Sequence, residues 1–265
     1  APRALRIVAL SDTHGFEGSL RPEEVPKGDL LVHCGDFSPD CPRGKRERHL
    51  RRFDSWLRAV SLARFRGRRP LVIRGNHDPR VLNAFLTPCR LTTSAGSVNC
   101  RQFPESRALY FDSACQLDVA NCTVRVAALP WNAAPLRPAH AEGVDVLLSH
   151  APPRGVLDTC LDGKSAGSKL IRQVLADQRR GPKVHIFGHI HEEAGSCLQR
   201  FGRGDADEVL CVNAAMANDG MAVALTRPAS VVELLVGPGG VLSARHVRAG
   251  SSSSSLTSSS SSLAR

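Results

Sequence analysis

The chain has 265 residues, of which 42% are hydrophobic and 23% are charged, and its formal net charge is +10 at pH 7. This length is within the range of a two-sheet α/β fold and allows a core of adequate size. The sequence contains no run of about eighteen apolar residues and no charged-then-apolar leader. We therefore expect neither a transmembrane segment nor a signal peptide.

The predicted strands and helices follow from the apolar runs. Short runs rich in Val, Ile and Leu predict buried strands at 5–10, 30–33, 71–74, 144–148 and 184–187. Helices are expected at 44–65, 79–85 and 167–180, a β-rich middle at 108–129, and late strands at 208–213, 221–225 and 231–236. Parallel strands with helices early in the chain, and mostly strands late, predict two packed sheets with helices outside.

The arginine-rich segment between 43 and 66 raises the question of nucleic-acid binding. Its apolar residues recur at the helical period, at Leu50, Phe53, Leu57 and Val60. Nucleic-acid binders usually interleave stacking aromatic residues with the basic ones, and only Phe53, Trp56 and Phe65 are available here. We favour a helix with a solvated basic face, whose positive field would still attract anionic phosphoesters.

The cysteines of the chain indicate its cellular compartment, and its serines indicate where the folded domain ends. The nine cysteines are odd in number and include no Cys-x-x-Cys pair, which favours free thiols in a reducing compartment, so we expect a cytoplasmic protein. Residues 250–262 are almost all serine, too polar to offset the entropy of ordering. We expect one domain over 1–249 and a disordered Ser-rich tail over 250–265. The sequence does not indicate an oligomeric state.

Five short polar clusters stand out, and each follows one of the predicted buried strands. They are Asp12-Thr-His14, Gly35-Asp36, Gly75-Asn76-His77-Asp78, Ser149-His150 and Gly188-His189-Ile-His191. In open α/β sheets the ligand crevice lies beyond the carboxyl ends of the strands, so the clusters should meet at one edge. Carboxylate, carboxamide and imidazole ligands suit Mn, Fe or Zn, whereas an oxygen-only set would suit Mg or Ca.

The number of ligands indicates two metal ions with a catalytic role. Seven candidates, with one carboxylate shared, give about four protein ligands per ion and leave room for water. In an extended segment residues i and i+2 face the same side, so Asp12 and His14 should share a cavity, as should His189 and His191. A hydroxide held between two such ions attacks a phosphorus in line, so phosphoester hydrolysis fits best.

Each cluster alone has an ordinary structural explanation. Gly-Asp usually marks a turn, and Gly-Asn-His-Asp is compatible with a simple left-handed turn between a strand and a helix. The five clusters together, in this order, are hard to assign to chance. The remaining histidines lack partner motifs, and we expect structural roles for His33, His49, His140, His185 and His246.

The order of clusters resembles that of the calcineurin-like metallophosphoesterase superfamily, over residues 5 to about 213. Four stretches are similar to the metallophosphoesterase-domain-containing subgroup related to bacterial class III cyclic-nucleotide phosphodiesterases: GDLLVHCGDF at 28–37, LPW at 129–131, GVDVLLSHAPPRGVLD at 143–158 and KVHIFGHIHEEAG at 183–195. The resemblance implies a four-layer α/β/β/α sandwich of two mixed sheets flanked by helices.

The resemblance also implies a role for each residue. One metal ion would be bound by Asp12, His14, Asp36 and His191, and the other by Asp36, Asn76, His150 and His189, with Asp36 bridging. His77 would stand beside the leaving-group oxygen as general acid, oriented by Asp78. An imidazolium there can protonate a departing alkoxide, and a neighbouring carboxylate raises its pKa.

The protein serine/threonine phosphatases of this superfamily carry Gly-Asp-x-x-Asp-Arg-Gly. Here the corresponding stretch is Gly35-Asp36-Phe-Ser-Pro-Asp40-Cys, without that spacing or the arginine, although Arg74 before Gly75 is similar to their third motif. The expected substrate is therefore a small phosphodiester, such as a cyclic nucleotide.

The alternatives are a nuclease acting on RNA or DNA and a scaffold protein that keeps the fold but has lost turnover. Trp131 either stacks on a base or fills the core.

Overall fold

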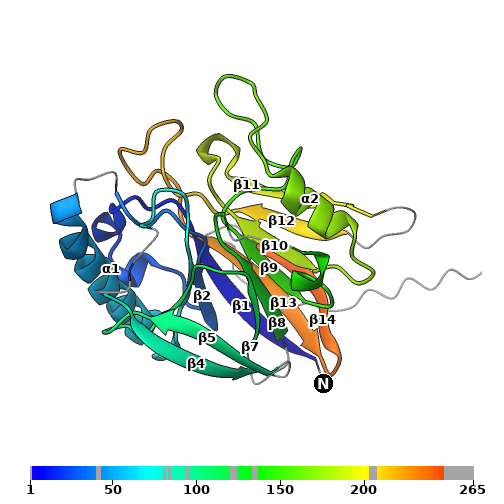
Figure 1. The fold of residues 1–265 in the computed structure, drawn as a ribbon, viewed down its shortest axis with the longest axis horizontal. Helices are drawn as coiled ribbons and strands as arrows, with labels where there is room; N and C mark the ends of the chain where they lie inside the picture. Colours follow the sequence, from blue (N-terminus) through cyan, green and yellow to red (C-terminus); the bar gives the residue numbers. More distant parts are fainter. Residues whose placement is uncertain are drawn as a thin grey trace, which may run out of the picture.

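A computed structural model describes residues 2–39, 43–79, 82, 85–93, 96–119, 124–132, 137–202 and 208–247. Two β-sheets form its centre (Figure 1). The eight-stranded sheet has the order β14-β13-β1-β2-β3-β6-β5-β4. Its strands are β1 (Arg3–Leu10), β2 (Leu30–His33), β3 (Leu71–Ile73), β4 (Thr87–Thr93), β5 (Gly96–Gln102), β6 (Leu109–Phe111), β13 (Ser230–Gly237) and β14 (Gly240–Val247).

The second sheet has six strands in the order β11-β12-β10-β9-β8-β7. These are β7 (Cys115–Val119), β8 (Val124–Leu129), β9 (Val146–Ser149), β10 (Val184–Phe187), β11 (Gly195–Gln199) and β12 (Val209–Asn213). Both sheets are mixed. Strands β1, β2, β3 and β6 run parallel in one sheet and β8, β9, β10 and β12 in the other, while the outer strands of each sheet pair antiparallel.

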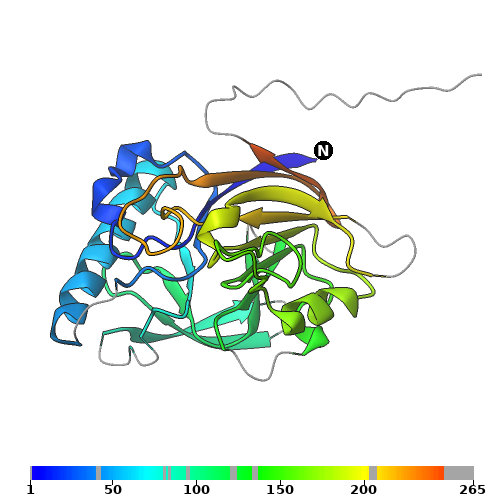
Figure 2. The same ribbon diagram turned by 90° about the horizontal axis from the view of Figure 1, so that it is seen from above.

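Helices cover the outer face of each sheet. Helix α1 (Arg43–Arg64) packs Phe53, Leu57 and Val60 against the outer face of β1, β2 and β3, and helix α2 (Lys169–Ala176) packs Ile171 and Val174 against the outer face of the six-stranded sheet. Alternate residues of the strands fill the largest core between the two sheets. The two helices lie on opposite sides of the molecule (Figures 1 and 2), which confirms the predicted four-layer sandwich.

The packing of helix α1 shows whether the aromatic residues of the basic segment are exposed and could stack on nucleic-acid bases. Phe53, Trp56 and Phe65 are all buried, and the Trp56 indole donates a hydrogen bond to the backbone oxygen of Leu20. The exposed face of α1 carries arginines such as Arg51 and Arg58 with no exposed aromatic side chain among its described residues. The helix therefore has the solvated basic face that its period predicts.

Most predicted elements occur within two residues of their expected ends, but the late strand at 221–225 is wrong. This stretch is an exposed loop held by Asn218, whose side chain accepts hydrogen bonds from the amides of Val223 and Ala224 and donates to the oxygen of Met221. Strands β4, β5, β11 and β14 were not predicted from the sequence, although β13 was predicted. The short helix expected at 79–85 and the tail at 250–265 fall largely or wholly outside the described residues.

Backbone hydrogen bonds join the loops where the parallel strands end, and the bond between Met216 and Ser11 joins the two sheets. The amide of Asp12 donates to the oxygen of Gly35, the amide of Gly188 to the oxygen of His150, and the amide of Met216 to the oxygen of Ser11. The loops that follow β1, β2, β9, β10 and β12 thus lie side by side. No helix in the described part of the chain is both long and apolar enough to cross a bilayer.

Candidate metal centre

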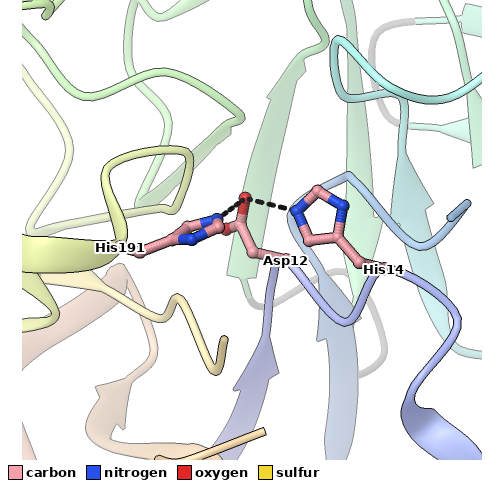
Figure 3. Close-up of side chains that lie close together, drawn as sticks. All are labelled: Asp12, His14 and His191. Atoms are coloured by element: carbon pink, nitrogen blue, oxygen red, sulfur yellow. Dashed lines mark ion pairs between the residues drawn. The ribbon is translucent and has the colours of Figure 1, made fainter. Parts of the chain in front are cut away.

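The first group of candidate ligands consists of Asp12, His14 and His191 (Figure 3). Their ligand atoms lie within 4.8 Å of one another, and all three residues are buried. Asp12 Oδ1 is 3.4 Å from His191 Nε2 and 4.0 Å from His14 Nε2. One carboxylate and two imidazoles thus converge from the loops after β1 and β10.

The second group consists of Asp36, His150 and His189, again with ligand atoms within 4.8 Å of one another. Asp36 Oδ2 lies 3.3 Å from His150 Nε2, and Asn76 Oδ1 lies 2.7 Å from the same nitrogen. Asp36 Oδ2 is also 3.9 Å from His14 Nε2 of the first group. Asp36 therefore stands between the two groups, where a bridging carboxylate would have to be.

Backbone carbonyl groups orient the imidazoles. His150 Nδ1 donates to the oxygen of Cys34 at 2.8 Å, and His191 Nδ1 donates to the oxygens of Asn218 and Gly220 at 3.0 Å each. A proton held on Nδ1 leaves the Nε2 lone pair directed into the site, which is the usual arrangement for a metal-binding histidine.

Two buried polar atoms at the centre have no hydrogen-bond partner. They are Asp12 Oδ1 and His14 Nε2, and both belong to the first group. A buried polar atom without a partner is costly unless another ligand satisfies it. The pairing of carboxylate oxygens with imidazole nitrogens is the donor set that transition-metal ions prefer. The residues present therefore fit a pair of such ions.

Several candidate ligands have strained backbones. The φ angles are 55° at Asp12, 45° at His14, 56° at Asp36 and 72° at His189, all in the left-handed region that non-glycine residues rarely adopt. Such strain concentrates at functional sites, where the surrounding structure must hold it. Asp12 and His14 share a cavity because of these turns, and not because of the extended backbone that the sequence reasoning assumed.

Two glycines permit the close approach of the loops. A Cβ atom on Gly75 would lie 2.1 Å from Asp36 Oδ1, and one on Gly188 would lie 2.2 Å from Asp12 Oδ2. The amide of His189, next along from Gly188, donates to Asp12 Oδ2 at 2.9 Å. The glycines in these two motifs therefore leave space for the carboxylates.

The electrostatics of the centre are those of a site for cations. Burial would raise the pKa of Asp12, but the nearby His191 and His150 outweigh it and hold the pKa well below its usual value. Burial would likewise lower the pKa of His150, but the Asp36 and Asp12 carboxylates raise it to about 9. Burial and the neighbouring His150 lower the pKa of His189 to about 4. Ionised carboxylates thus face imidazoles across the centre.

His77 lies at the open side of the centre. Its side chain is 34% exposed, and its Nε2 is 3.9 Å from Asp36 Oδ2. Its ring centroid is 5.0 Å from that of His14, and its amide donates to Asp36 Oδ1 at 2.8 Å. A side chain in this position can reach a molecule bound over the two groups.

Asp78 has partners that the sequence did not anticipate. Its carboxylate accepts hydrogen bonds from the amides of Gly75, Asp36 and Ser38 at 2.8 to 2.9 Å. It therefore fastens the loop after β2 to the loop after β3. That Asp78 also orients His77 stays a prediction.

Trp131 belongs to the wall of the centre. Its ring centroid is 4.8 Å from that of His189 and 5.8 Å from that of His150. Two hydrogen bonds join Trp131 to Arg74. The Trp131 amide donates to the backbone oxygen of Arg74, and the Arg74 guanidinium donates to the backbone oxygen of Trp131. Trp131 is partly buried against the core, so it packs there and also faces the ligands.

The other histidines with described contacts lie outside the two groups. His33 Nε2 is 3.0 Å from Thr13 Oγ1, and His185 Nε2 is 2.7 Å from Ser149 Oγ. Burial lowers the pKa of both to about 3, so both are neutral. They support the loops that carry the candidate ligands. The backbone carbonyls of Cys34, Asn218 and Gly220 are the parts of the site that sequence reasoning missed, because no side-chain type marks them.

Comparison with known proteins agrees with this geometry. The calcineurin-like phosphoesterase family matches residues 5–193. The UPF0046 protein K07C11.7 of Caenorhabditis elegans is 28% identical over 250 residues, covering 84% of this chain and 73% of that protein. Human Metallophosphoesterase domain-containing protein 1 is 27% identical over 225 residues, covering 73% of this chain and 63% of that protein. The chain thus spans somewhat less than two thirds of the human relative.

A solved crystal structure shares the fold, with a TM-score of 0.52 and 13% identity over 89% of this chain and 95% of that one. The family match covers most of the sandwich and includes all five polar clusters. The chain belongs to the calcineurin-like phosphoesterase family.

Proposed function

We propose that the protein is a metal-dependent phosphodiesterase that hydrolyses a small phosphodiester. The observation that carries the proposal is the position of Asp36, with one carboxylate oxygen 3.3 Å from His150 Nε2 and 3.9 Å from His14 Nε2. A carboxylate between two ligand groups is the arrangement that two-metal hydrolases require. Family membership supports phosphoester hydrolysis as the general reaction.

The ligand sets follow the two groups. We assign Asp12, His14, Asp36 and His191 to one ion, and Asp36, Asn76, His150 and His189 to the other. The ions would be Mn, Fe or Zn, because imidazole and carboxylate ligands accept all three. A bound pair would supply Lewis-acid stabilisation of the phosphoryl oxygens and a water acidic enough to attack near neutral pH.

His77 is the proposed general acid. It is the one candidate catalytic side chain that is substantially exposed while lying beside Asp36, so it can meet a substrate that the ligand residues cannot. Its protonated ring would donate to the leaving alkoxide, which is too basic to depart unaided. Its backbone amide, bonded to Asp36 Oδ1, keeps the backbone of His77 next to the proposed bridging carboxylate.

The preferred substrate is a small diester, with a cyclic nucleotide as the leading candidate. Trp131 lies against two ligand imidazoles and offers an aromatic wall that a base can contact. A nuclease is less well supported, because the aromatic residues of the basic helix are buried and cannot stack on a strand. The odd number of cysteines and the absence of Cys-x-x-Cys pairs support a cytoplasmic location.

An activity screen of the purified protein tests the proposal. Metal-free protein is loaded with Mn, Fe or Zn and assayed against bis(4-nitrophenyl) phosphate, 3′,5′-cyclic AMP, 2′,3′-cyclic AMP and a 20-nucleotide RNA. Two equivalents of metal with turnover of the small diesters are expected. Two equivalents without turnover of any substrate would favour the scaffold alternative. Cleavage of RNA alone, with affinity falling steeply as salt rises, would favour the nuclease.

A further inference from the structure

The β4–β5 hairpin places two cysteine thiols side by side, outside the two groups of candidate metal ligands. Cys89 and Cys100 are directly opposite each other in the antiparallel register, and their sulfur atoms are 3.1 Å apart. Directly opposite residues of antiparallel strands have Cα atoms about 4.5–5.5 Å apart, within the range of about 4.4–6.8 Å found for disulfides. The backbone therefore does not have to move for a bond to form between the two sulfurs.

The surroundings distinguish the two sulfurs. The Arg69 guanidinium donates to Cys89 Sγ at 3.5 Å, and it is held there by a 2.7 Å hydrogen bond to Gln102 Oε1 and a 2.8 Å bond to the oxygen of Arg107. The guanidinium thus holds a positive charge beside the Cys89 sulfur. Burial and the neighbouring Cys89 raise the pKa of the Cys100 thiol to about 12, so this thiol is protonated near neutral pH.

Both thiols are accessible to small molecules. They line a surface pocket of about 550 Å³, and each is only partly buried. The lining of the same pocket includes Arg90, Arg101 and one acidic residue, Asp112, so its net positive charge would attract a molecule that carries carboxylates. A low-molecular-weight disulfide such as glutathione disulfide has this chemistry.

We propose that Cys89 and Cys100 form a reversible dithiol–disulfide site that reacts with glutathione disulfide, with Cys89 as the attacking thiol and Cys100 as the resolving thiol. The Cys89 thiolate bonds to one sulfur of glutathione disulfide, whose S–S bond breaks, and one glutathione leaves and takes up a proton. Cys100 then loses its proton to solvent and attacks the Cys89 sulfur, which releases the second glutathione. Two protein thiols are oxidised and one glutathione disulfide is reduced to two glutathiones.

A second cross-strand pair provides a contrast. Cys197 and Cys211 are also directly opposite each other, between β11 and β12. Cys211 is fully buried among Val156, Phe187 and Val209, whereas Cys197 is partly buried. A small disulfide therefore has access to Cys197 but not to Cys211 of this pair.

The test uses the full chain in glutathione buffers of fixed reduced-to-oxidised ratio, followed by rapid alkylation, digestion and mass spectrometry. The wild-type protein should give a peptide cross-link between Cys89 and Cys100 that disappears on addition of dithiothreitol. C100S should stop at a mixed disulfide between Cys89 and glutathione. C89S should give neither product. C197S/C211S, the matched control, should give the same cross-link as the wild type.

The role of Arg69 is tested separately in the C100S background. R69Q should slow glutathione addition to Cys89 severalfold, whereas R68Q, at an exposed neighbouring arginine, should leave the rate unchanged. Circular dichroism checks that each variant is folded. The proposal is overturned if folded wild-type protein gives no such cross-link, if Cys100 links to Cys115 instead, or if C89S takes up glutathione as fast as C100S. None of these outcomes depends on phosphodiesterase activity.

Discussion

Asn76 and His150 meet at 2.7 Å, between Oδ1 and Nε2, although the strands that precede them belong to different sheets. Asn76 follows β3 in the eight-stranded sheet, and His150 follows β9 in the six-stranded sheet. His150 is in turn held through Nδ1 by the oxygen of Cys34, which follows β2. The proposed second metal site therefore exists only when the two sheets are packed together.

Replacing Asp36 with asparagine should remove one of the two proposed ions. The amide has no negative charge to share between the two groups, so metal content should fall to at most one equivalent and kcat by about 10²–10³-fold or more. Metal analysis and diester hydrolysis measure the two effects. Asp177→Asn, at the end of α2, is the matched control and should change neither. A variant at position 36 that keeps two ions and full activity would contradict the bridging assignment.

Gly75→Ala should weaken metal binding although it replaces none of the candidate ligands. The added Cβ would lie 2.1 Å from Asp36 Oδ1 and 2.4 Å from the Asp36 amide nitrogen, so Asp36 has to shift. Mutating a residue that supports a metal ligand typically weakens metal affinity by about 10–100-fold. Gly18→Ala, where a Cβ would meet nothing within 4 Å, should bind metal as the wild type does. Isothermal titration calorimetry with Mn²⁺ compares the metal affinities of the two variants.

His77→Asn should separate metal binding from acid catalysis. Both ions should stay, because His77 is outside the two ligand groups. Diesters with an alkoxide leaving group should be cleaved about 10²–10³-fold more slowly, since general acid catalysis contributes about that much, while 4-nitrophenyl esters should be slowed far less. Single-turnover rates on an alkyl and an aryl diester make the comparison. Equal slowing of both would mean that His77 is not the proton donor.

Glu17 should make the protein less stable as pH rises. Its side chain is buried, Oε2 has no hydrogen-bond partner, and burial raises its pKa from 4.5 to about 7. Between those two pH values the folded chain keeps a proton that the unfolded chain has lost, so the free energy of unfolding decreases with increasing pH. Glu17→Gln stays neutral, and above pH 7 it should be more stable than the wild type by up to about 3 kcal/mol.

Urea unfolding of Glu17→Gln and the wild type at pH 5 and pH 8 measures this difference. Glu47→Gln, at an exposed residue paired with Arg51 on α1, should show almost no change between the two pH values. A Glu17→Gln advantage that is the same at pH 5 and pH 8 would assign the effect to packing and not to ionisation.

The sequence by itself determined the sandwich class, most strands and the identity of the candidate ligands. Buried parallel strands such as Val184–Phe187 read as unbroken apolar runs, and the polar clusters follow at their carboxyl ends. These signals are local, because they depend on residue type and on spacing along a single segment. The failed strand at 221–225 has the apolar composition of a strand, but the side chain of Asn218 binds its amides instead.

Only the tertiary structure decided how the candidate ligands face one another. It placed Asp36 between the two groups, gave Asp78 three backbone amides to bind, and set Trp131 against His189. It also paired Cys89 with Cys100 beside Arg69. These relationships join segments distant in the chain, often through backbone carbonyls and amides that every residue carries. Residue type therefore cannot reveal them, whereas the packing of the two sheets fixes them.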